Sequence, residues 1–244
     1  MKILALDSSG LVASAALVED DNLIAEYTIQ YKKTHSQTLL PMLEEIRDMV
    51  ELDLNTVDAI AVAAGPGSFT GLRIGSATAK GLAFALNKPI VPVPTVDGLA
   101  WQMYGTDALV CPIMDARRSQ VYTGIYEFLY KEDKYDMNVI VEQYATAFDE
   151  VAERLNELER KVVFLGDGVP VFRERMAEVM RVPYSLAPAN RNRQSAACIA
   201  VLGSQYYALG RVESGARHAP VYLRLSQAER ERAESQDRQT AEVD

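Results

Sequence analysis

The sequence predicts an α/β protein built from two related lobes, each with a mixed sheet flanked by helices. Three observations support this fold class. The first thirty residues alternate short apolar runs with tight polar turns, as is typical of an antiparallel meander. Residues 58–93 then run from an apolar strand through a glycine-rich loop and a helix to a second strand, an order that requires a parallel crossover. A partly similar order begins again after residue 105.

The first lobe is expected to begin with three antiparallel strands at 2–8, 11–18 and 23–31, joined by polar turns. A helix follows from Ser36, because apolar side chains recur there at steps of three and four residues. Pro41 lies inside this pattern, so we expect either a kink or a helix that starts one turn later.

A strand at 58–64 is apolar throughout, which predicts burial on both faces of the sheet. It leads through the loop at 65–71 into a helix that ends near Leu86 and then into a strand at 90–93. In the second lobe the predicted strands are 108–114, 120–128 and 162–165, and the predicted helices are 146–158 and 171–179. A further helix at 195–209 and a short extended segment at 220–224 are predicted after it.

The expected domain boundaries follow from this partial repeat. The first lobe covers 1–106 and the second, smaller lobe covers 107–194, and the returning segment 195–225 is expected to pack on the first lobe. Residues 226–244 are nearly all charged or small, which favours a solvated tail without a core of its own.

The composition excludes several classes of function. The 244 residues include 25 Lys and Arg against 34 Asp and Glu, a net charge of −9, so the chain has no general affinity for nucleic acid. Two Cys and two His are too few for a disulfide scaffold or a His/Cys zinc site. Asp7 interrupts the first apolar run, and no uncharged stretch is long enough to span a membrane. We therefore expect a cytoplasmic protein without a membrane segment, a metal or a cofactor.

The glycine-rich loop between the apolar strand and the helix is the densest chemical signal. It matches neither the dinucleotide pattern, because Thr70 stands where the last glycine belongs, nor the P-loop, because Gly71 is followed by Leu72 and Arg73. Two explanations stay open: a vestigial phosphate loop at a helix N-terminus, or glycines required only by the turn. With the turn that ends the first strand, the candidate nucleotide-binding residues are Asp7, Ser8, Gly65, Gly67 and Thr70.

The helix after this loop has a face of small side chains. Each glycine inside a helix costs roughly 1 kcal/mol relative to alanine, so a close approach of another backbone is expected to compensate. That neighbour is either another element of this chain or another subunit. The face comprises Gly71, Ile74, Thr78, Gly81 and Ala85, extended by Gly75.

Taken in order, several segments resemble the bacterial TsaB family, and the resemblance covers about residues 1–224. They are the opening ILALDSS, His35-Ser36-Gln37 followed by Leu39-Leu40-Pro41, GPGSFTGLRIG with Ala79-Lys80-Gly81-Leu82-Ala83, Met114-Asp115-Ala116-Arg117-Arg118 before Val121-Tyr122, Gly166-Asp167-Gly168, and Pro220-Val221-Tyr222-Leu223-Arg224.

The resemblance implies an actin-like, ribonuclease-H-like fold of two lobes. It also implies a supporting role in forming the threonylcarbamoyl group on the anticodon-adjacent adenosine of tRNA, as a partner of the catalytic, metal-binding TsaD and of the ATPase TsaE. In that family the early helices pair with TsaD, and the same surface can form a homodimer. Carried over here, the expected partner interface comprises His35, Leu39, Leu43, Ile46, Gly71, Ile74, Gly75, Thr78, Gly81 and Ala85.

Two positions, four residues apart, separate a catalytic from a supporting role. The catalytic relative places His-x-x-x-His after the strand that follows the loop and helix, whereas this sequence has Thr95 and Leu99 there. Neither side chain can replace an imidazole ligand. We therefore expect no catalytic residue, no metal site and no tight binding of tRNA by this chain alone. The alternative is an ATP-dependent small-molecule kinase of the same fold, in which Asp7 and the loop at 65–71 hold ATP.

Overall fold

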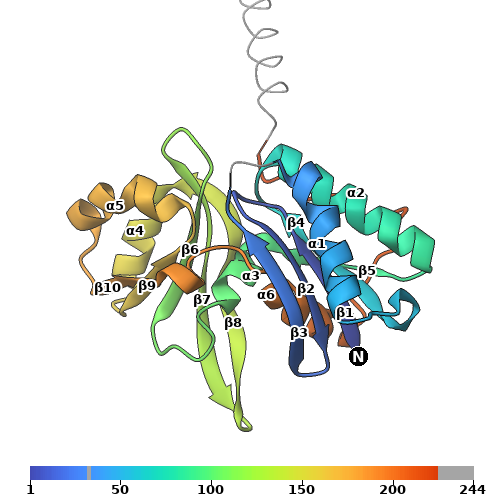
Figure 1. The fold of residues 1–244 in the computed structure, drawn as a ribbon. Helices are drawn as coiled ribbons and strands as arrows, with labels where there is room; N and C mark the ends of the chain where they lie inside the picture. Colours follow the sequence, from blue (N-terminus) through green and yellow to red (C-terminus); the bar gives the residue numbers. More distant parts are fainter. Residues whose placement is uncertain (32–33, 225–244) are drawn as a thin grey trace, which may run out of the picture.

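The computed structural model of the protein describes residues 1–31 and 34–224, so the tail expected at 226–244 lies outside the described residues. Two five-stranded sheets form two lobes that lie side by side (Figure 1). The first sheet has the order β3-β2-β1-β4-β5 and the second the order β10-β9-β6-β7-β8. In both, the first strand of the lobe pairs antiparallel with the second and parallel with the fourth.

The first lobe is built from residues that precede the middle of the chain. Its elements are β1 (Lys2–Asp7), β2 (Ala13–Glu19), β3 (Asn22–Ile29), α1 (His35–Met49), the short 3-10 helix Leu54–Thr56, β4 (Ala59–Gly65), α2 (Phe69–Leu86) and β5 (Ile90–Pro94).

The second lobe repeats this order of elements. They are β6 (Leu109–Asp115), β7 (Gln120–Lys131), β8 (Lys134–Ala147), α4 (Phe148–Glu157), β9 (Val162–Leu165), α5 (Gly168–Val179) and β10 (Tyr184–Leu186). The lobes are connected by α3 (Thr95–Trp101) and, after the 3-10 helix Ala189–Arg191, by α6 (Ala196–Ala208). Two copies of one mixed-sheet topology in one chain confirm the two-lobed, actin-like fold class.

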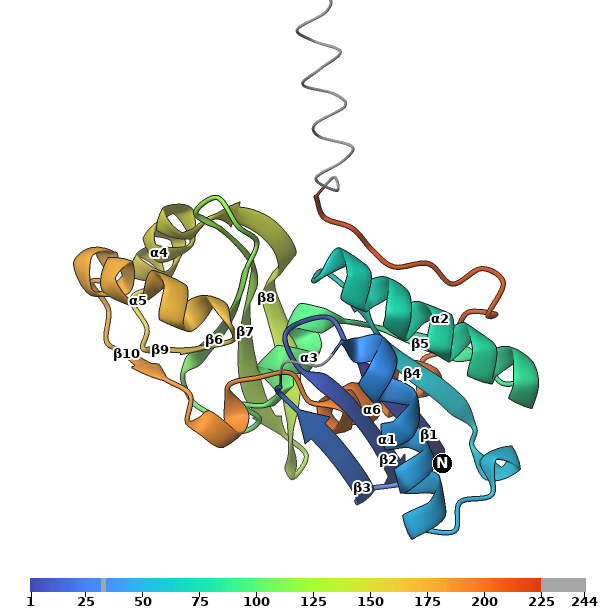
Figure 2. The ribbon, with the colours of Figure 1, turned by 45° about the horizontal axis from the view of Figure 1, so that its top comes forward.

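Helices cover both faces of each sheet (Figure 2). In the first lobe α1 and α2 pack on one face, where they bury Leu4 and Leu6 of β1, and α6 covers the other face, where it buries Ile3 and Ala5. In the second lobe α4 and α5 cover one face and α3 the other. The two connecting helices are therefore exchanged: α3 follows the first sheet but packs in the core of the second, and α6 follows the second sheet but covers the first.

Some elements differ from the sequence prediction. The late start of the first helix is wrong, because α1 runs without interruption from His35 through Pro41. Burial of its apolar stripe against the sheet outweighs the one helical hydrogen bond that a proline removes. Three elements were not predicted: α3, β8 and β10. Residues 220–224 form no strand, although the Val221 amide donates to the Ala64 carbonyl.

Candidate functional site

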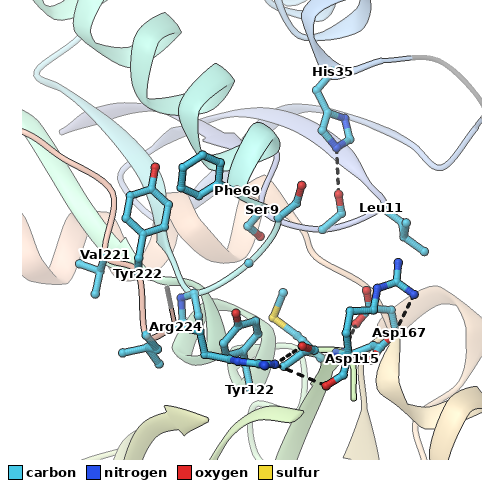
Figure 3. A pocket seen from close by; sticks show the side chains of 18 of the residues that line it. Ser9, Leu11, His35, Phe69, Asp115, Tyr122, Asp167, Val221, Tyr222 and Arg224 are labelled. Carbon is cyan, nitrogen blue, oxygen red and sulfur yellow. Dashed lines mark hydrogen bonds and ion pairs between the residues drawn. The ribbon is translucent and has the colours of Figure 1, made fainter. Parts of the chain in front are cut away.

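A cleft of about 520 Å³ lies between the two lobes, at the ends of β1, β4 and β6. Figure 3 shows side chains from both lobes and from the end of the described chain pointing into it. Its lining includes Ser9, His35, Phe69, Asp115, Arg117, Tyr122, Asp167, Tyr222 and Arg224.

Asp7, at the end of β1, is fully buried and bonded within its own turn. Its carboxylate accepts hydrogen bonds from the Ser9 amide at 2.9 Å and the Ser9 hydroxyl at 2.6 Å. Burial raises the pKa of Asp7 to about 6, against the opposing effect of the two Ser9 hydrogen bonds and of His35. His35 itself bonds the Gly10 carbonyl through Nε2 at 2.9 Å, so its ring belongs to the cleft wall (Figure 3).

Gly67 in the loop and Gly71 and Gly75 in α2 face the β1–β2 turn of their own lobe. A Cβ on Gly67 would lie 2.2 Å from the Ser9 carbonyl oxygen, and one on Gly71 would lie 2.0 Å from that of Ser8. A Cβ on Gly75 would lie 2.6 Å from the Ser8 hydroxyl oxygen. Close packing inside the chain therefore explains these three glycines without a bound phosphate. Gly65 has a φ of +116°, which a side chain rarely adopts.

The second lobe lines the cleft with the β6–β7 turn. Its residues Arg117, Arg118 and Ser119 all have positive φ, at 64°, 57° and 57°. Asp115 accepts the Arg117 amide at 2.8 Å and pairs with its guanidinium at 3.2 Å. Asp167 accepts the Asp115 amide, and burial raises the pKa of Asp167. This wall of the cleft carries the exposed charge of Arg117, whereas in the opposite wall the Asp7 carboxylate is buried and hydrogen-bonded to Ser9.

Thr95 and Leu99, at the positions of the paired histidines of the catalytic relative, are both buried. The Thr95 hydroxyl accepts the Gly65 amide at 3.1 Å, and Leu99 packs in the core of the second lobe. Within residues 1–31 and 34–224 no cluster of three or more His, Cys, Asp or Glu side chains could hold a metal ion. None of the helices in this part of the chain is both long and apolar enough to cross a bilayer.

The predicted interface residues divide between core and surface. Leu39, Leu43 and Ile46 are at most 8% exposed and form the core between α1 and the first sheet. Gly71 and Gly75 are buried as well, whereas Ile74 and Thr78 are half-buried and Gly81 and Ala85 are exposed. No atom lies within 4 Å of where a Cβ on Gly81 would be.

The sequence analysis did not identify the apolar side chains that α1 and α2 expose. Leu40 is 54%, Met49 70% and Phe84 89% exposed, and Figure 2 shows the two helices beside each other on one face of the lobe. Periodicity could have identified Leu40 and Phe84 as lying outside the buried stripes, whereas Met49 continues the stripe of α1 and is exposed because the helix ends there. We name the outer side of these two helices, with Leu40 on α1 and Gly81, Phe84 and Ala85 on α2, the α1–α2 face.

Two lobes of one topology, with a cleft between them and exchanged connecting helices, define a protein of the actin-like class. The chain is 34% identical over 241 residues to tRNA threonylcarbamoyladenosine biosynthesis protein TsaB of Bacillus subtilis, covering 97% of this chain and all of that protein. It is 31% identical to the Escherichia coli protein of the same name, covering 92% and 95%. This chain belongs to the TsaB family.

Two further comparisons agree with this assignment. The family model described as TsaD, tRNA N6-adenosine threonylcarbamoyltransferase, matches residues 22–231. The solved structure of YeaZ from Pseudomonas aeruginosa superposes with a TM-score of 0.76 at 29% identity, over 91% of this chain and 99% of that one. A second Pseudomonas aeruginosa structure, described as similar to peptidase YEAZ, gives a TM-score of 0.77 at 30% identity, over the same shares of the two chains.

Proposed function

We propose that this chain is a non-catalytic partner subunit in the synthesis of threonylcarbamoyladenosine in tRNA, acting with the catalytic TsaD and the ATPase TsaE in the cytoplasm. The observation that carries the proposal is similarity over nearly the whole chain to proteins named for that pathway. The burial of Thr95 and Leu99 at the positions of the metal-binding histidines supports a supporting role.

The α1–α2 face is the proposed contact surface for TsaD, and for a homodimer when TsaD is absent. Phe84 offers a large, exposed aromatic side chain, the type that most often anchors an interface. Gly81 and Ala85 on the same helix leave room for a partner backbone to approach closely. Leu39, Leu43 and Ile46 would act indirectly, by holding α1 against its sheet.

The cleft is proposed as a vestigial nucleotide site. The Asp7 carboxylate accepts hydrogen bonds from Ser9, and the Ser8 hydroxyl donates to the Gly71 carbonyl. Gly67 lies against the Ser9 carbonyl and Gly65 against that of Val221, so all four residues have packing roles of their own. Thr70 is exposed outside the cleft lining. The kinase alternative requires tight binding of Mg-ATP and substrate-dependent hydrolysis by this chain alone. Isothermal titration of the purified chain with Mg-ATP distinguishes the two.

Gel filtration of this chain mixed with TsaD tests the proposed partnership. The wild-type chain is expected to co-elute with TsaD, and Gly81→Arg is expected to elute separately, because position 81 is open to solvent and the substitution leaves the fold intact. Gly75→Arg is unsuitable, since its side chain would displace the β1–β2 turn. Absence of co-elution by the wild-type chain under every nucleotide condition would refute the proposal.

Binding of tRNA tests the assignment of RNA contacts to the partner. At a net charge of −9 this chain alone is expected to give no salt-sensitive gel shift with tRNA. A shift that weakens as salt is raised would place RNA contacts on this subunit instead.

A further inference from the structure

The end of the described chain, Ala219–Arg224, belongs to neither sheet and runs along the mouth of the cleft. Figure 2 shows it leaving the far end of α2 and returning along that helix towards the gap between the lobes. Four of its residues line the cleft, from Val221 to Arg224. We name this segment the strap.

The strap is attached to the first lobe by several specific contacts. The Val221 amide donates to the Ala64 carbonyl at 2.7 Å, at the end of β4. The Val221 carbonyl oxygen lies 2.2 Å from where a Cβ on Gly65 would be, so only glycine permits this approach. The ring of Tyr222 lies 4.8 Å, between centroids, from that of Phe69 at the start of α2 (Figure 3).

The side chain of Arg224 reaches the second lobe. Its Nη1 donates to the carbonyl oxygens of Ala116 and Arg117, the latter at 3.4 Å, in the turn between β6 and β7 (Figure 3). A guanidinium that bonds backbone carbonyls fixes a geometry rather than neutralising a charge. The strap therefore begins on one lobe and ends on the other.

Other contacts between the lobes lie deeper. The Asp97 carboxylate in α3 accepts the hydroxyls of Tyr126, from the second lobe, and Tyr206, from α6. The Gln143 amide of β8 donates to the Gly65 carbonyl at 3.2 Å. None of the residues in these contacts lines the cleft, whereas four residues of the strap do, so the strap is the contact that acts on the cleft itself.

We propose that the strap is a latch that sets the opening of the cleft and covers the start of α2. Its release lets the lobes move apart and exposes the loop at 65–71. The latch is a property of this chain alone and does not depend on the proposed partnership.

Point variants of the full-length chain test the latch from its two ends. Arg224→Ala removes the contact with the second lobe, and Val221→Pro removes the amide bonded to Ala64. Arg217→Ala is the matched control, because Arg217 is an exposed arginine that precedes the strap. The distance between the lobes is measured between two spin labels, one on a cysteine placed at the exposed Glu44 of α1 and one on a cysteine placed at the exposed Glu153 of α4. Cys198→Ser provides the background, and the labelled protein is diluted with unlabelled protein.

The latch predicts that Arg224→Ala and Val221→Pro each lengthen the distance between the labels by more than about 2 Å and broaden its distribution, while Arg217→Ala leaves it unchanged. Amide exchange at Val221 is expected to accelerate at least about tenfold in Arg224→Ala. Unchanged distances in a folded Arg224→Ala protein would overturn the proposal. So would an equal shift in Arg217→Ala, since the effect would then follow the charge and not the strap. If Val221→Pro does not fold, Arg224→Ala alone decides.

Discussion

The outer helices of the two lobes occupy equivalent places and have different surfaces. In the first lobe α1 and α2 leave Leu40, Met49 and Phe84 exposed. In the second lobe Arg175 of α5 joins Asp149 of α4 through two hydrogen bonds of 2.8 and 2.7 Å and also pairs with Glu178. The outer helices of the first lobe thus expose several large apolar side chains beside the Arg47–Asp48 pair of α1, whereas those of the second lobe are joined to each other by an ion pair. The apolar surface is the one suited to a partner, because ion pairs bridging two neighbouring helices satisfy each other within the chain.

The turns that face each other across the cleft differ in the same manner. After β1, Asp7 is buried and bonded to Ser9, whereas after β6 the equivalent Asp115 pairs with an arginine whose side chain is 84% exposed. Gly65 is the last residue of β4 and Gly166 follows the equivalent strand β9, and both have φ above +100°. The two lobes share a backbone conformation at these glycines, whereas the turns after β1 and β6 differ in backbone as well as in side chains, because Arg117, Arg118 and Ser119 have positive φ and residues 8–12 do not.

The largest expected effect tests whether the periodic stripe of α1 belongs to the core. Ile46→Ala is expected to lower the free energy of unfolding by about 2–5 kcal/mol, because Ile46 is fully buried and the substitution leaves a cavity. Leu40→Ala on the exposed side of the same helix should change it by less than about 0.5 kcal/mol. Urea unfolding followed by circular dichroism measures both. Similar values for the two variants would contradict the division of α1 into a core side and a surface side.

This division also shows where sequence analysis succeeded and where it failed. A spacing of three and four residues identified Leu39, Leu43 and Ile46 as one face of a helix. The Asn87-Lys88-Pro89 run predicted the end of α2 at Leu86 correctly. The same spacing cannot say whether that face meets the chain's own sheet or another subunit, so the exposed apolar residues that we propose as the contact surface, Leu40 and Phe84 among them, were missed.

The site was predicted less completely than the fold, for physical reasons. The strand β8 is partly exposed along most of its length and lacks a clean alternation, and α3 is buried all round, so neither has a periodic signal. The left-handed residues Arg117, Arg118 and Ser119 have none of the glycine or asparagine that marks such a turn. The contact of Arg224 with residues more than one hundred positions earlier depends on how the lobes are placed, which no local pattern specifies.

The second expected effect is a pH dependence of stability, which comes from the buried Asp7 before the β1–β2 turn. The pKa of Asp7 is raised to about 6 in the fold from 3.8, so the folded protein binds more protons than the unfolded chain between these values. Stability should therefore fall as pH rises through this range, by up to about 3 kcal/mol. Asp7→Asn removes the ionisation, and its stability relative to wild type should rise by about that amount between pH 4 and pH 7.

Urea unfolding across this pH range measures the effect, with Asp21→Asn on the exposed β2–β3 turn as the control. A constant difference between Asp7→Asn and wild type at all pH values would show that the buried carboxylate does not ionise in this range.

The third effect concerns the exposed surfaces and addresses the proposed partnership. Phe84→Arg is expected to weaken pairing with TsaD by at least about 30-fold, the loss of roughly 2 kcal/mol or more that truncating an interface anchor causes. Val171→Arg is the matched control, since Val171 is a 59% exposed apolar residue on α5 of the other lobe. Isothermal titration gives both dissociation constants. Equal weakening by the two variants would remove the asymmetry between the lobes as the basis of recognition.

The smallest effect is expected where the second lobe carries its ion pairs. Arg175→Ala breaks the contacts of this guanidinium with Asp149 and Glu178. The hydrogen bond from Arg175 holds the pKa of Asp149 below its usual range. All three side chains are about half exposed, so the loss of stability should not exceed about 1 kcal/mol and should shrink further in high salt. Thermal unfolding at two salt concentrations measures it. Affinity for TsaD should be unaffected, because these residues keep the α4–α5 surface solvated rather than prepare it for a partner. A large loss of affinity in Arg175→Ala would assign recognition to the charged lobe and reverse the comparison.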